Sequence, residues 1–188
     1  MPSGWKTFTT SDGTLTFDYP GDWSIKGTPG KPAPGGTSVE VANAAGKPMA
    51  TLQTNVITGS ECLEKVPFSV LDSEQMPALA QKGVPNEGAP RYVFETRGDA
   101  SAAAPTRSTL AAYGITMMPE EAGTLACPLF LFFNWPPSGA TFASGYNPAN
   151  NTTPGSPSLP YLQKAKLYVE TGEYRNIRRM ITSLRPAK

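Results

Sequence analysis

The sequence predicts a layered α/β structure in which a central strand is covered on both faces. The segment Leu125–Trp135, L-A-C-P-L-F-L-F-F-N-W, has apolar side chains in both phases of a strand. A strand that is apolar on both sides must be covered on both sides. The chain then ends in two segments of helical periodicity, and one face of the second is apolar enough to pack on the sheet.

Length and composition favour a single domain over residues 1–188, because domains usually contain roughly 100–200 residues. A chain of this size buries enough surface to fold without a metal ion or many disulfides. The 20 prolines and 18 glycines beside an apolar fraction of 39% indicate an ordered core joined by long, turn-rich loops. The longest loops are predicted at about 27–37 and 136–158.

The N-terminal segments are predicted to form strands. Lys6–Thr10 is rich in β-formers, and Asp12-Gly13 favours a tight hairpin turn after it. Large apolar side chains then alternate with polar ones through Gly13–Ile25, with a turn at Pro20-Gly21, so this stretch reads as a bent strand that builds the core. Further strands are predicted at Ser38–Ala42, Met49–Ile57, Val66–Leu71, Arg91–Arg97 and Arg107–Met117.

Two helices are predicted at the end of the chain, over Leu159–Val169 and from about Gly172 to Leu184. Thr171 has the side chain of a helix N-cap and directly precedes the second helix. Pro186 marks its stop.

The composition argues against most enzyme mechanisms. The chain contains no histidine, which removes Ser-His-Asp and Cys-His arrangements and the commonest metal ligand. It has no G-x-S-x-G element and no phosphate-binding loop. We therefore expect a protein that is not an enzyme and that uses no cofactor and no metal, with an enzyme based on carboxylates alone as the remaining alternative.

Cys62 and Cys127 are too far apart in sequence for a C-x-x-C redox site or a zinc knuckle. They are either a disulfide in an oxidising compartment or two buried thiols. The disulfide is favoured because Cys62 lies in a polar stretch, whereas Cys127 opens an apolar one. The start of the chain resembles a mature protein without its leader, so we expect an extracytoplasmic domain, secreted or anchored to the cell envelope.

Two groups of residues are candidates for binding a partner. Arg175, Arg178 and Arg179 are predicted on the side of the last helix opposite its apolar face, as a patch for an acidic partner or simply as a solvated face. Trp135, Phe142 and Tyr146 can line a groove or a ligand pocket. Alternatively, they hold the predicted loop at about 136–158, which we call the late loop, against the core. A net charge of +1 gives no global field that points to nucleic acid.

Two stretches carry a family resemblance: F-D-Y-P-G-D-W-S-I (Phe17–Ile25) and E-Y-R-N-I-R-R-M-I-T-S-L-R-P (Glu173–Pro186). The chain resembles the PsbP-like fold family, which includes the lumenal extrinsic subunit of photosystem II, a Ran-binding nuclear import factor and many bacterial lipoproteins of unknown role. The resemblance implies an α+β fold with an antiparallel six- to seven-stranded sheet between helical layers, an α/β/α sandwich with the C-terminal helix packed on the sheet. The photosystem subunit's metal and partner residues have no matching positions in this sequence.

Together these observations predict a non-enzymatic, extracytoplasmic binding or accessory domain of a bacterial envelope protein or lipoprotein. Its partner would be a protein or an envelope component, and any membrane attachment would use a lipid anchor outside this sequence. The alternative is a carrier of a small apolar ligand, with its pocket near Trp135 and Tyr146.

Overall fold

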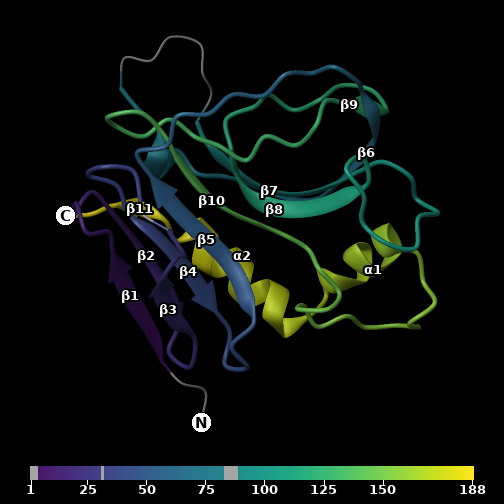
Figure 1. Cartoon of the computed structure of the whole chain (residues 1–188), viewed down its shortest axis with the longest axis horizontal. Coiled ribbons are helices and arrows are strands. Elements are labelled where there is room, and N and C mark those ends of the chain that lie inside the picture. Colours follow the sequence, from purple (N-terminus) through teal and green to yellow (C-terminus); the bar gives the residue numbers. More distant parts are fainter. Residues whose placement is uncertain (1–3, 31, 83–88) are drawn as a thin grey trace.

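The computed structural model describes residues 4–30, 32–82 and 89–188. Over these residues the protein is mostly β, with an eight-stranded and a three-stranded antiparallel sheet and two short C-terminal α-helices (Figure 1). Within this part of the chain, no helix has the length and apolar character needed to cross a membrane.

The small sheet has the order β1-β2-β11. The predicted hairpin is confirmed: β1 (Trp5–Thr9) pairs with β2 (Leu15–Pro20), and Gly13 takes a positive φ of 70° in the turn between them. Leu15 and Phe17 of β2 are fully buried, so this element builds the core as its alternation predicts. β11 (Arg185–Pro186) returns the chain end to the other edge of β2.

The large sheet has the order β3-β4-β5-β10-β8-β7-β6-β9. A short 3₁₀ turn, η1 (Pro77–Leu79), follows β6. The strands are β3 (Ser24–Gly27), β4 (Ser38–Ala42), β5 (Pro48–Thr54), β6 (Val66–Gln75), β7 (Arg91–Arg97), β8 (Leu110–Thr116), β9 (Leu125–Ala126) and β10 (Ala140–Gly145).

Both predicted helices are present, as α1 (Tyr161–Tyr168) and α2 (Gly172–Thr182). Thr171 caps α2 as predicted, because its side chain accepts a hydrogen bond from the backbone N–H of Tyr174. The apolar face of α2 is buried through Tyr174, Ile177, Met180 and Ile181.

The helices and the small sheet cover the same face of the large sheet, which we call the inner face. Strand register places Leu52, Phe142, Tyr113 and Phe94 on this face. Phe142 is opposite Leu52, and Tyr113 is opposite both Phe94 and Ser144, which is two residues after Phe142 and so on the same face. Phe17 of β2 packs on Phe142, and Tyr174 of α2 stacks on Phe94. One apolar core therefore lies between the large sheet and these elements.

The predicted α/β/α sandwich is wrong, because helices lie on one face of the large sheet only. The opposite face, which we call the outer face, carries Arg91, Glu95 and Arg97 of β7. Over β7 and β8 it is covered by residues 117–134, a mostly irregular stretch that we call the cover segment. Backbone carbonyls of this segment accept hydrogen bonds from outer-face side chains.

The predicted central strand Leu125–Trp135 is also wrong. Only Leu125–Ala126 pairs as a strand, and Phe133 forms a single bridge to Ala140. Pro128 interrupts the segment and supplies no N–H for a ladder. Phe130 and Phe132 of one phase stack on each other and line a cavity with Arg91, whereas Phe133 of the other phase is buried in the core.

The predicted loop 136–158 contains a strand that it was not expected to hold. β10 lies in the middle of the large sheet, between β5 and β8, and its Phe142 is fully buried. The strand is short, rich in small residues and flanked by prolines, so it has little local signal. Pairing along both of its edges fixes it instead.

Candidate functional site

The outer face of β7 holds three buried charged side chains. Arg91, Glu95 and Arg97 occur in one strand phase and are 5–6% exposed. The carboxylate of Glu95 lies 2.8 Å from Nη1 of Arg97 and 3.6 Å from Nη1 of Arg91. Two guanidinium groups therefore share one carboxylate, which leaves an excess positive charge in this cluster.

The two arginines differ in how closely they are held. Arg97 donates from Nε to the carbonyl oxygen of Cys127 at 2.7 Å and from Nη1 to that of Thr96 at 3.1 Å. Arg91 donates to the carbonyl oxygen of Met118 at 3.3 Å and to Oγ of Ser73 at 3.5 Å. The guanidinium of Arg97 is thus fixed, while that of Arg91 has longer and weaker contacts.

A cavity of about 630 Å³ opens beside Arg91 between the outer face and the cover segment. We call it the outer groove. Its apolar wall consists of Phe130, Phe132, Met117 and Met118, and Gln75, Glu120 and Asn134 contribute polar groups. The rings of Phe130 and Phe132 stack with centroids 5.3 Å apart. The groove therefore combines an aromatic wall with an arginine at one side.

Glycine 139 sets the position of the aromatic wall. A Cβ atom built on Gly139 collides with the ring of Phe132 and lies 3.1 Å from the carbonyl oxygen of Val56. The absence of a side chain at this position allows the Phe132 ring to approach the backbone closely.

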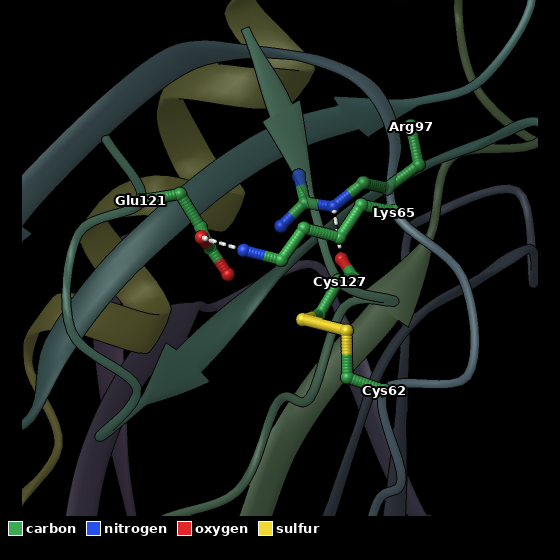
Figure 2. The surroundings of a disulfide bond; sticks show 5 residues. All are labelled: Cys62, Lys65, Arg97, Glu121 and Cys127. Carbon is green, nitrogen blue, oxygen red and sulfur yellow. Dashed lines mark hydrogen bonds and ion pairs between the residues drawn. A yellow bond between two sulfur atoms is a disulfide. The ribbon is translucent and has the colours of Figure 1, made fainter. Parts of the chain in front are cut away.

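The cover segment is fixed to the rest of the fold by a disulfide (Figure 2). The predicted bond between Cys62 and Cys127 is confirmed, and the alternative of two free thiols is wrong. It joins the cover segment to the connection between β5 and β6, and the ion pair of Lys65 with Glu121, at 3.8 Å, joins the same two stretches. Arg97 donates a hydrogen bond to the carbonyl oxygen of Cys127 (Figure 2). The cover segment and the β5–β6 connection are therefore both held against β7 at this point. A structural disulfide is typical of oxidising, extracytoplasmic compartments.

The three aromatic residues predicted as a binding site are not brought together in the outer groove. Trp135 is 8% exposed and donates from Nε1 to Oγ1 of Thr14. Phe142 is in the inner-face core, and the ring of Tyr146 packs between those of Tyr161 and Tyr168. Their burial agrees with the interpretation that they hold the chain against its core, and a ligand role for them stays a prediction.

The three arginines of α2 do not form one open patch. Arg178 pairs with Asp72 at 2.7 Å and with Glu74 at 2.8 Å, which ties α2 to β6. The guanidinium of Arg179 lies 4.0 Å above the ring of Trp5. Arg175 donates to the backbone carbonyl of Glu170 at 2.8 Å. Carboxylates therefore neutralise Arg178, whereas Arg175 and Arg179 are exposed and keep their positive charge. A role for them with an acidic partner stays a prediction.

The inner face has a polar network built on tyrosines and two carboxylates, those of Glu173 and of Asp72, which accepts from the hydroxyl of Tyr174 at 2.8 Å. Burial raises the pKa of six tyrosines, Tyr92, Tyr113, Tyr146, Tyr161, Tyr168 and Tyr174, so their hydroxyls stay protonated and donate. Glu173 accepts from the hydroxyl of Tyr168 at 2.8 Å, from the backbone of Thr152 at 3.0 Å and from the amides of Asn43 and Asn151. This network joins α1, α2, the β4–β5 turn and the late loop. Its polar groups hydrogen-bond to one another, so the network stabilises the fold.

Metal chemistry finds no support in the described residues. Across 4–30, 32–82 and 89–188, no group of three or more Cys, Asp or Glu side chains lies close enough to hold an ion. Buried side-chain nitrogens and oxygens in this part of the chain all have hydrogen-bond partners.

Comparison of this chain with protein-family models, with curated proteins and with solved structures finds no match. The PsbP-like resemblance therefore stays a prediction. The fold and the site define a disulfide-bonded, mostly-β domain. Helices cover one face of its large sheet, and the other face has an apolar groove with an arginine at one side.

Sequence reasoning missed the outer groove. Its signal is the strand R-Y-V-F-E-T-R, in which aromatic residues occupy one phase and Arg91, Glu95 and Arg97 the other. A strand flanked by others on both sides with three charges in one phase indicates a polar face that needs its own partners. The sequence pattern predicts Phe130 and Phe132 on one side of a strand, whereas in the structure they form part of the apolar wall of the outer groove.

Proposed function

We propose that this chain is a non-enzymatic, extracytoplasmic binding domain and that the outer groove is its ligand site. One observation carries the proposal: an aromatic wall and a buried arginine converge on a cavity of about 630 Å³. Sites for small molecules are concave and mostly apolar, have a few fixed polar groups and usually measure roughly 300–1,000 Å³.

The residues around the groove support binding more than catalysis. The carboxylate of Glu95 forms ion pairs with two arginines, so its oxygens already have partners within the protein. Glu120 is exposed at the rim, in contact with solvent. Among the described residues that line the groove, there is no nucleophile paired with a base, which covalent catalysis requires.

The disulfide supports an extracytoplasmic location, either secreted or held at the cell envelope. In the bacterial setting that the PsbP-like resemblance implies, the domain would be part of an envelope protein or lipoprotein, with any lipid anchor outside this sequence. Its partner would be an envelope component, or a protein that presents an apolar group to the outer groove. A carrier of small ligands is the second candidate, and the volume of the outer groove, about 630 Å³, favours it.

The test uses the uncharged fluorophore N-phenyl-1-naphthylamine, whose emission rises in apolar sites. We expect the wild-type protein to bind it and the double variant Phe130→Ala/Phe132→Ala to bind at least about tenfold more weakly, a change of about 1.4 kcal/mol. Leu167→Ala is the control, because Leu167 is an exposed apolar residue on α1, away from the groove. Absence of binding to the wild type, or equal losses in both variants, overturns the proposal.

A further inference from the structure

The charge balance of the cluster on β7 points beyond a purely apolar ligand. Arg91 and Arg97 are both about 5–6% exposed, and Glu95 is the carboxylate they share. Moving a charge out of water is costly unless a close opposite charge and hydrogen bonds compensate it. Among the residues that the structure describes, one buried guanidinium of this cluster therefore lacks a carboxylate of its own.

That guanidinium belongs to Arg91. The Glu95 carboxylate lies closer to Arg97, at 2.8 Å, than to Arg91, at 3.6 Å. The other contacts of Arg91 are with neutral oxygens, those of Met118 and Ser73, at 3.3 and 3.5 Å. A guanidinium has five N–H donors in a planar fork, which suits an oxyanion with two acceptor oxygens.

Arg91 also lines the outer groove, next to Phe130, Phe132 and the two methionines. From this juxtaposition, and resting on the function proposed above, we infer that the ligand of the outer groove is an amphipathic monoanion. Its single oxyanion group, such as a carboxylate or a sulfonate, pairs with Arg91. Its aromatic or alkyl body lies against the Phe130–Phe132 wall.

The surrounding charges favour one negative charge on the ligand and not two. Glu120 lines the same groove at its exposed rim, so a second anionic group on the ligand would meet a like charge there. Glu121, the next residue, is paired with Lys65 at 3.8 Å. The positive charge that faces the groove is therefore local to Arg91, and selectivity for an anion depends on that side chain.

A matched pair of probes separates charge from apolar contact. 1-Anilinonaphthalene-8-sulfonate has the same aromatic body as N-phenyl-1-naphthylamine and adds one sulfonate. We expect the wild type to bind the sulfonate at least about tenfold more tightly than the neutral compound. Arg91→Gln should remove that preference, so that the ratio of its affinities for the two probes falls to about one. Arg107→Gln is the matched control, since Arg107 is an exposed arginine in the β7–β8 connection.

Failure of the inference is distinguishable from failure of the proposed function. If the wild type binds both probes equally and Phe130→Ala/Phe132→Ala weakens both, the groove binds ligands but the anion selectivity is wrong. An unchanged preference in Arg91→Gln equally overturns the role of Arg91. If the double phenylalanine variant weakens neither probe, the groove itself is not the site.

Arg91→Gln should fold, because Glu95 keeps its shorter ion pair with Arg97, and thermal unfolding checks this. A measurement on the wild type alone covers the case in which it does not fold. Decanoate and 1-decanol differ in a carboxylate against a hydroxyl, and each is titrated against bound N-phenyl-1-naphthylamine. Displacement by decanoate at about a tenth of the decanol concentration supports the inference, and equal displacement overturns it.

Discussion

Removal of the Cys62–Cys127 disulfide is the perturbation whose size follows most directly from the structure. The bond connects residues that are 65 positions apart. Constraining a loop of this length in the unfolded chain corresponds to about 4 kcal/mol of stability in the chain-entropy treatment. Domains of this kind are usually stable by only about 5–15 kcal/mol, so the loss would be a large share of the total.

The variant is Cys62→Ser/Cys127→Ser, compared with wild type in urea by tryptophan fluorescence. We expect the urea midpoint to fall, with a loss of about 3–4 kcal/mol in the free energy of unfolding. This is slightly below the chain-entropy value, because the measured effect of a disulfide is often smaller than that value. Wild type unfolded in the presence of a reductant is the control and should match the variant. A variant as stable as oxidised wild type would refute the reasoning.

The same variant connects stability with the groove. The disulfide, the Lys65–Glu121 pair and the bond from Arg97 to Cys127 together fix the cover segment against β7. Loss of the disulfide removes the one covalent link among them. We therefore expect the folded variant to bind N-phenyl-1-naphthylamine more weakly, with little change in far-ultraviolet circular dichroism. Unchanged affinity would show that the noncovalent contacts suffice to shape the groove.

Two further predictions concern the inner face. Glu173→Ala leaves the buried hydroxyl of Tyr168 and the amide of Asn151 without their carboxylate acceptor and should cost about 2–4 kcal/mol in urea unfolding. Glu170→Ala, at an exposed position, should stay within about 0.5 kcal/mol, and equal losses would contradict the role of Glu173. Burial raises the pKa of the six tyrosines above the value of about 10 in the unfolded chain, so the stability they give is complete below pH 10 and is lost as pH rises above it. Phenolate absorbance during alkaline titration should therefore rise together with unfolding, and full ionisation of the folded protein would contradict this.

The parts of the fold that were predictable from sequence are those with a local cause. The turn at Asp12-Gly13 needs a positive φ, which glycine supplies, and the hairpin forms there. Thr171 provides the oxygen that the first turn of α2 requires, and α2 begins after it. Strand alternation in β2 correctly assigned Leu15 and Phe17 to the core.

The errors have a common physical origin in contacts between distant segments. Leu125–Trp135 is apolar in both phases, but side chains of β7 and β8 bond to its carbonyl oxygens at Cys127 and Phe130, so this part of it lies across a sheet instead of inside one. β10 has a weak local pattern and exists because β5 and β8 pair with both of its edges. Neither arrangement is visible in periodicity, which reports the environment of a strand but not its neighbours.

The candidate site was beyond local reasoning for the same reason. Arg91 and Phe130 are far apart in sequence and meet only because the cover segment returns over β7. The charged phase of β7 signals an unusual outer face, but the sequence does not say which segment covers it. A prediction based on aromatic content selected Trp135, Phe142 and Tyr146, which the fold uses inside or at the edge of its core.

The placement of charge also bears on why the outer face differs from the inner one. On the inner face, neutral tyrosine hydroxyls donate to the carboxylates of Glu173 and Asp72, and apolar side chains fill the rest. The outer face instead keeps two arginines and one glutamate buried beside a groove. Apolar residues of similar volume often stabilise a protein as well as a buried ion pair does, so stability alone gives little reason for this cluster. A ligand that supplies the missing negative charge to Arg91 gives one.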